Sequence, residues 1–224
     1  MSGGSRTMGG SDSLVIYTIG HSNHDVKKFT ALLRGAGITA VADVRSTPFS
    51  RFTPQFNRSA LKVVLAEAGI AYSFLGEELG ARPKDRACYR DGTAVYELIA
   101  KTSFFQAGLE RVLKGTQRYR IALMCTEKDP LDCHRNILVA RHLGARGACI
   151  RHILANGRVE ENAATELRLL KLTGQRMRDM FVHEAMGEPL TRAYEIRGAT
   201  IAYTEVGAEQ DESSPSHDER GTRQ

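Results

Sequence analysis

The segment that decides the fold is residues 121–135, which read IALMCTEKDPLDCHR. Its first four residues form an apolar run of strand length, and the residues after Arg135 return to the apolar spacing of a helix. Two thiols, three carboxylates, an imidazole and a guanidinium therefore lie where a buried strand passes into a helix. In an α/β sheet this turn is at the carboxyl end of a strand, where ligands usually bind. The segment predicts a functional site.

The same alternation of strand and helix extends outward along the chain. Helical spacing occurs at 26–33, 61–68, 95–113 and after Cys133, between apolar runs at 14–19, 38–44, 70–75, 121–124 and 149–154. This order predicts an α/β fold, a mainly parallel sheet with helices on both faces. A polar loop is expected at 76–92. Further helical spacing after Gly157, including 177–186, predicts a C-terminal helical extension, and a β-like run at 200–203 predicts a terminal strand.

Composition divides the chain into four parts. We expect a disordered Gly/Ser-rich N-terminus at 1–12, an α/β core domain at 13–155, the helical extension with its terminal strand at 156–204, and a disordered acidic tail at 205–224. No apolar run is long enough to span a bilayer, and the N-terminus lacks the apolar stretch of a signal peptide. We therefore expect a cytoplasmic protein with no membrane partner, whose four cysteines are reduced.

The charge is unevenly distributed. The whole chain has 31 basic and 26 acidic residues, a net charge of +5. Six acidic and only two basic residues lie in 205–224, so the rest of the chain carries 29 basic and 20 acidic residues. A basic body suits a phosphate-bearing or nucleic-acid partner, although ordinary enzymes also show such an excess.

Three predicted strands end in polar residues. His21, Ser22 and Asn23 follow the first strand, Asp43 and Arg45 the second, and Cys125 and Glu127 the fourth. Because the carboxyl ends of parallel strands meet at one edge, we expect His21, Asp43, Arg45, Cys125 and Glu127 to line one cleft.

Each of these groups also has a structural interpretation. Ser22 or Asn23 could cap the helix that begins near Asp25. Asp43 could pair with Arg45, and Cys125 could be a small core residue.

Cys133 is predicted to lie in the first turn of a helix capped by Asp132. The helix dipole and free amides, with His134 and Arg135, would lower the pKa of this thiol and bind an anion there. Cys133 is then expected to be the most reactive cysteine, with Cys88 in its loop as the competitor. Two rival interpretations are a zinc site built from Cys125, Cys133 and His134, and a redox pair of the two thiols.

Aromatic and arginine side chains alternate in residues 48–58, PFSRFTPQFNR, and two prolines exclude regular structure. This mixture suits stacking on a base with guanidinium contacts to phosphate. It equally suits a loop that phenylalanine side chains attach to the core.

Several ordered blocks resemble the domain-of-unknown-function 488 family: TIGHSN at 18–23, DVRSTPFSR at 43–51, LGEELG at 75–80, and MCTE at 124–127 with CHR at 133–135. The resemblance extends from about Val15 to Ile153. It implies that these blocks carry the family's characteristic residues, and it implies no established reaction. Glu77 and Glu78 depart from the smaller residues of many relatives, and residues 201–203 resemble the terminal strand of longer members.

The leading interpretation is a hydrolase or transferase that acts on a phosphate-bearing substrate such as a nucleotide or nucleic acid. The candidate catalytic residues are His21, Asp43, Glu127, Cys133 and His134. The candidate substrate-binding residues are Ser22, Asn23, Arg45, Ser50, Arg51 and Arg135. No cofactor is predicted apart from zinc in the rival interpretation of the cysteines. Two further functions fit the same residues: a non-catalytic nucleotide or nucleic-acid binding module, and a thiol-redox or metal-binding protein.

Overall fold

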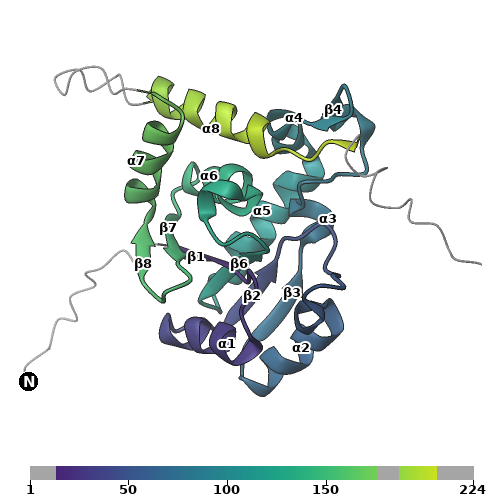
Figure 1. The fold of residues 1–224 in the computed structure, drawn as a ribbon, viewed down its shortest axis with the longest axis vertical. Coiled ribbons are helices and arrows are strands. Elements are labelled where there is room, and N and C mark those ends of the chain that lie inside the picture. The colour runs from purple at the N-terminus through teal and green to yellow at the C-terminus, as the bar shows by residue number, and fades with distance from the viewer. Residues whose placement is uncertain (1–13, 176–186, 206–224) are drawn as a thin grey trace, which may run out of the picture.

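The computed structural model describes residues 14–175 and 187–205 (Figure 1). The predicted disordered N-terminus at 1–12, the helical stretch at 177–186 and all of the acidic tail after Glu205 lie outside the described residues.

The core is a six-stranded sheet in the order β3-β2-β6-β1-β7-β8. The first five of these strands are parallel, and β8 joins the edge antiparallel to β7. The strands are β1 (Val15–Gly20), β2 (Ala40–Asp43), β3 (Ala71–Phe74), β6 (Ile121–Cys125), β7 (Cys149–Ile153) and β8 (Val159–Glu161). The central strands β1 and β6 are almost wholly buried, which explains their continuous apolar runs.

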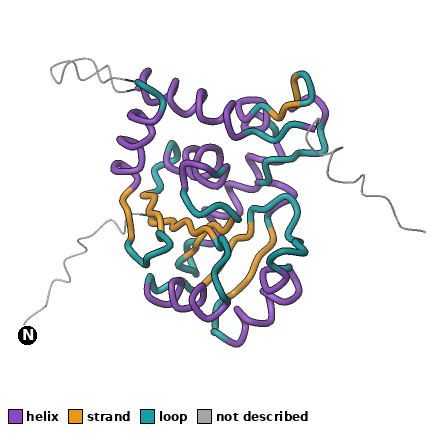
Figure 2. The backbone as a smooth tube through the Cα atoms, viewed as in Figure 1, coloured by secondary structure: helices purple, strands orange, loops and turns teal. Residues whose placement is uncertain are grey.

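Helices cover both faces of the sheet (Figures 1 and 2). On one face, α1 (Val26–Gly35) and α2 (Arg58–Glu67) pack against the side of β1 that carries Tyr17 and Ile19. The opposite side, which carries Ile16, is covered by α5 (Ser103–Gly115), the π-helix η4 (Arg135–Ala140) and α6 (Arg141–Gly144). Alternate residues of a strand point to opposite faces, so the chain builds two apolar layers around one sheet. The predicted fold class is confirmed.

Two regions differ locally from the prediction. The helix expected at 95–113 is interrupted at Thr102, whose hydroxyl accepts a hydrogen bond from the Phe105 amide and caps α5; the preceding turns form α4 (Tyr96–Lys101). The loop expected at 76–92 contains short elements, because its backbone groups pair locally. They are α3 (Gly76–Leu79), η2 (Arg86–Cys88) and β4 (Tyr89–Arg90), which forms a hairpin with β5 (Thr93–Ala94). Two further short helices, η1 (Pro54–Phe56) and η3 (Pro130–Asp132), lie elsewhere in the chain.

In its described residues the C-terminal extension is helical, as predicted, and contains α7 (Asn162–Leu172) and α8 (Gly187–Ile201). The terminal strand expected at 200–203 is wrong. Burial of Ala193 and Tyr194 holds this segment as a helix through Ile201, and both edges of the main sheet are already formed by β3 and β8. The chain then makes a single bridge, from Thr204 to Thr93 of the hairpin. Within the described ranges no helix combines the length and apolarity needed to cross a membrane.

Candidate functional site

The ends of β1, β2 and β6 form one continuous edge. Gly20 pairs with Cys125, and Asp43 pairs with Met124. Beyond the strands the backbones stay joined, because the His21 amide donates to the Cys125 carbonyl at 2.9 Å and the Ser22 amide donates to that of Thr126 at 2.8 Å. The turn after β6 therefore lies directly on the turn after β1.

Glycine at position 20 permits this close approach. A Cβ atom at Gly20 would lie 1.8 Å from the Glu127 carbonyl oxygen, well inside van der Waals contact. The same applies to Gly76, where a Cβ would lie 1.9 Å from the Arg45 carbonyl oxygen. Two glycines thus bring remote loops against the strand ends.

A cleft of about 360 Å³ lies at this edge. From the predicted cluster, Arg45, Cys125, Glu127 and His134 line it. His21 and Asp43 do not, so the expectation that all of the predicted strand-end residues line the cleft is wrong for these two. Both are hydrogen-bond partners of Arg45.

Asp43 and its neighbours hold Arg45 in place. The buried Asp43 carboxylate accepts hydrogen bonds from Arg45 Nε at 2.9 Å, from Arg45 Nη2 at 2.7 Å and from the Tyr72 hydroxyl at 2.7 Å. Arg45 Nη2 also donates to the Phe56 carbonyl at 2.8 Å. These contacts agree with the interpretation that Asp43 pairs with Arg45.

His21 is also a supporting residue. Its ring stacks on Phe56 with centroids 4.3 Å apart, and its Nδ1 lies 2.8 Å from the Ser22 carbonyl, so we assign the proton to Nδ1. Nε2 then accepts from Arg45 Nη1 at 3.2 Å. Burial, with the charge of Arg45, lowers the pKa of His21 to about 4. His21 is therefore better explained as a neutral ring that orients Arg45 than as a residue that transfers protons.

The two cysteines and His134 form a buried cluster beside the cleft. Cys125 Sγ lies 3.6 Å from His134 Nδ1, and His134 Nε2 lies 2.9 Å from the Val44 carbonyl oxygen. The possible ligand atoms of Cys125, Cys133 and His134 all lie within 4.8 Å of one another. This group is the part of the site that could hold a metal ion.

The cluster is electrostatically coupled. Burial and the neighbouring Cys133 raise the pKa of Cys125. Burial opposes ionisation of Cys133 too, but its hydrogen bond with Cys125 and the charges of Arg135 and His134 outweigh burial and lower its pKa. Burial of the carboxyl group and the proximity of Cys133 raise the pKa of Glu127. One thiol thus favours the thiolate while its neighbour stays protonated.

The predicted helix start at Asp132 is wrong. Asp132 ends η3 and pairs with Arg197 of α8, and Cys133 has an extended backbone. The Cys133 carbonyl accepts the first hydrogen bonds of the next helix, from the Asn136 and Ile137 amides, so Cys133 precedes the first turn. That helix is a π-helix, a distortion often found at functional sites.

Arg135 is almost completely buried and points back into the turn after β6. Its Nη1 donates to the Glu127 carbonyl at 2.6 Å, and its Nη2 donates to that of Lys128 at 3.3 Å. The side chain therefore holds the turn that carries Glu127, and it does not line the cleft.

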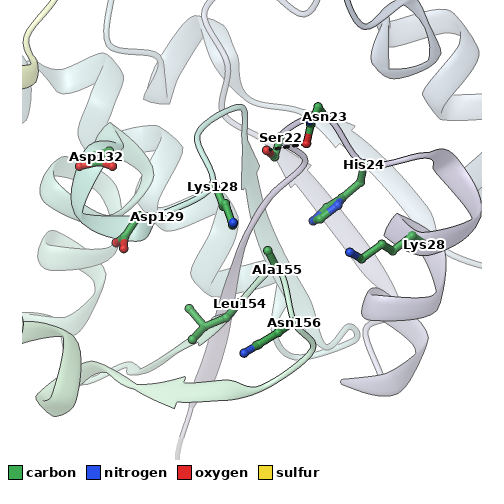
Figure 3. A pocket seen from close by; sticks show the side chains of 10 residues that line it. All are labelled: Ser22, Asn23, His24, Lys28, Lys128, Asp129, Asp132, Leu154, Ala155 and Asn156. Carbon is green, nitrogen blue, oxygen red and sulfur yellow. Dashed lines mark hydrogen bonds between the residues drawn. The ribbon is translucent and has the colours of Figure 1, made fainter.

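Ser22 and Asn23 line a different hollow of about 760 Å³, drawn in Figure 3. His24 and Lys28 enter it from the segment that follows β1, and Lys128 enters from the turn after β6. Neither Ser22 nor Asn23 caps α1, because the cap is Asp25, which accepts from the Lys28 amide at 2.7 Å.

The aromatic residues in the loop after β2 differ in their exposure to solvent. Phe56 is fully buried, whereas Phe49 and Phe52 are 69% and 81% exposed. The Ser50 hydroxyl accepts from the Phe52 and Thr53 amides, so Ser50 shapes the loop. Arg51 is exposed and lies over the Phe52 ring at 4.9 Å. The interpretation that phenylalanine attaches this loop to the core is thus correct for Phe56. Stacking of the exposed rings on a base stays a prediction.

Other cleft residues were not predicted. They are Ser46, Thr47, Phe49, Ala81, Arg82, Tyr96, Thr126, Asp132, Ile201 and Tyr203. Arg82 lies over the Tyr203 ring at 4.2 Å, which joins the loop after α3 to the segment that follows α8. Gly76 and Gly80 are the sequence feature that could have indicated Arg82. Because these glycines pack closely on Arg45 and Ser46, the loop that carries Arg82 lies against the cleft.

The fold and this edge define an α/β protein with a cleft that holds arginine, cysteine, histidine and carboxylate side chains at the carboxyl ends of its parallel strands. A family model described as "Domain of unknown function DUF488" matches residues 25–142, more than half of the chain. The chain belongs to this family, as its motifs predicted. Neither the curated proteins nor the solved structures include one that matches it.

Proposed function

We propose that this protein is an enzyme that acts on a phosphate-bearing substrate, a nucleotide or a nucleic acid, in the cleft beside β6. The observation that carries the proposal is that a carboxylate, Glu127, shares one cleft with two guanidinium groups, Arg45 and Arg82. Such a set combines a proton donor or acceptor with fixed charges that bind an anion.

The two arginines have different roles in the proposal. Arg45 is held rigidly by Asp43 and has one guanidinium nitrogen directed to His21. Arg82 is exposed, and among the residues described by the structure it has no carboxylate within ion-pair distance. Arg82 is therefore the better candidate for direct contact with a phosphate group.

The exposed aromatic side chains favour a nucleotide over a simple phosphate ester. Phe49 lines the cleft, and Phe52 lies nearby on the same loop with 81% of its surface exposed. A base stacked on such a ring contributes about 1–3 kcal/mol to binding, and Arg51 adds a positive charge beside it. A binding module without catalysis, the second candidate function, would use the same surface.

Turnover and binding separate the two functions. The purified chain is incubated with a panel of nucleotides and short DNA and RNA oligonucleotides, the products are identified by mass spectrometry, and binding is measured at several salt concentrations. We expect Glu127→Gln to abolish turnover while binding persists, and we expect Arg82→Ala and Phe49→Ala to weaken binding, because both residues line the cleft. Arg90→Ala and Phe104→Ala are matched controls, because both residues are exposed but lie outside the cleft.

Binding without turnover in the wild-type protein would favour the binding module. Equal binding by Arg82→Ala, Phe49→Ala and the controls would exclude this cleft as the site.

A further inference from the structure

We propose that Cys125, Cys133 and His134 bind a zinc ion at the inner wall of the cleft. The three side chains are buried, and their ligand atoms lie within 4.8 Å of one another. Within the described ranges no other group of three histidine, cysteine or acidic side chains meets this spacing. Two thiols with one imidazole are a soft donor set, which zinc prefers over magnesium or calcium.

The distances fit tetrahedral zinc. With Zn–S of about 2.3 Å and Zn–N of about 2.0–2.1 Å, a tetrahedral ion separates a sulfur ligand from a nitrogen ligand by about 3.6 Å. Cys125 Sγ and His134 Nδ1 are 3.6 Å apart. These two atoms are thus already spaced as ligands of one ion.

The other nitrogen of His134 has the partner that metal-binding histidines need. Nε2 lies 2.9 Å from the Val44 carbonyl oxygen, which can only accept, so this nitrogen carries the proton. Nδ1 is then left with its lone pair facing the cysteines. A backbone carbonyl that fixes the ring in this way is a common outer contact of histidine ligands.

Three ligands leave a fourth position for water. Cys125 and His134 line the cleft, whereas Cys133 lies behind them with 1% of its surface exposed. The fourth position would therefore face the cleft that also holds Glu127, the arrangement of a catalytic zinc site.

The role of this water rests on the proposed function, whereas the metal site does not. A zinc-bound water would lose one proton to the Glu127 carboxylate, and the hydroxide left on zinc would add to the electrophilic atom of the substrate. The bond between that atom and the leaving group would then break as Glu127 returns the proton to the leaving group, which completes a hydrolysis. Because water is the nucleophile in this sequence of steps, the zinc site favours a hydrolase over a transferase.

Metal analysis tests the site without any substrate. The full chain is expressed with added zinc and purified under reducing conditions without chelators, and its metal content is measured by mass spectrometry. We expect one zinc ion per chain, lost in Cys133→Ser and His134→Gln. Cys88→Ser is the matched control, because Cys88 is equally buried and lies outside the cluster, and Cys149→Ser is a second control; both should keep the metal.

Cobalt provides a readout that does not depend on the variants folding. Wild-type protein freed of zinc and loaded with cobalt should show an intense thiolate-to-metal charge-transfer band and the visible spectrum of tetrahedral cobalt. A reduced wild-type chain that binds neither metal would overturn the site, as would Cys133→Ser and His134→Gln variants with wild-type zinc content.

The two proposals fail separately. Zinc-loaded protein that turns over no substrate contradicts the proposed function alone. Turnover that survives complete removal of zinc contradicts the role of the metal. Glu127→Gln should keep zinc and lose activity.

Discussion

Tyr72 donates a 2.7 Å hydrogen bond to Asp43, the same carboxylate that holds Arg45 at the cleft. We expect Asp43→Asn to lower the free energy of unfolding by about 3–5 kcal/mol, because it leaves the buried guanidinium of Arg45 without its counter-charge. Tyr72→Phe removes one hydrogen bond and should cost about 1 kcal/mol. Urea unfolding measures both. Equal losses in the two variants would show that the ion pair contributes nothing beyond a hydrogen bond.

The contact between Gly20 and the Glu127 backbone gives a second prediction. Gly20→Ala should destabilise the fold by about 1–3 kcal/mol and displace the turn that carries Glu127, because the new methyl group would overlap a carbonyl oxygen. Gly35→Ala is the control: this exposed helical glycine has nothing within 4 Å, and alanine there should stabilise the protein by up to about 1 kcal/mol. Thermal unfolding compares them, and similar shifts of Tm would contradict the packing argument.

His152 makes stability depend on pH. Its Nδ1 lies 2.8 Å from the Thr18 hydroxyl and its Nε2 lies 3.0 Å from Asn162 Oδ1, and burial lowers its pKa from 6.5 to about 4. Between these pH values the unfolded chain binds a proton that the folded chain does not. Stability should therefore fall by about 1.4 kcal/mol for each pH unit below 6.5, down to about pH 4.

His21, with its pKa also lowered, should add a similar dependence over the same pH range. The measurement is urea unfolding from pH 7 to pH 4 in the wild type and in His152→Gln. The variant should show a shallower loss of stability. An unchanged pH slope would mean that His152 does not titrate as its surroundings imply.

Burial changes the expected order of cysteine reactivity. Cys88, Cys125 and Cys133 are each at most 4% exposed, and only Cys149 is partly exposed. We expect iodoacetamide at neutral pH to label Cys149 first, and the other three only after unfolding, because a reagent cannot reach them. Peptide mapping after limited labelling checks this. Early modification of Cys133 would instead support the sequence-based prediction that this thiol is the most reactive, and would argue against a thiol occupied by metal.

The regular part of the fold was predictable because its signal is local. Continuous apolar runs such as β6 indicate a strand buried on both faces, and the order of strands and helices then predicts a parallel sheet whose carboxyl ends share one edge. That argument correctly brought Cys125, Glu127 and Arg45 together.

The direction of each side chain was not predictable, because it depends on distant contacts. Arg135 turns back to the Glu127 and Lys128 carbonyls instead of facing the cleft. Arg82 and Tyr203 become cleft residues through contacts between segments far apart in sequence. Gly76 and Gly80 indicate a close approach of the loop, but no local pattern specifies which distant side chain it meets.

The position of β1 between β6 and β7 also determines when the protein can fold. The first strand of the sheet leaves the ribosome long before either of its hydrogen-bonding neighbours has been translated. Pairings between segments so far apart form slowly. Until residue 121 and the strand that it begins emerge, the nascent chain carries VIYTIG as an apolar strand without a partner. We expect this segment to be the one that a chaperone must shield during translation.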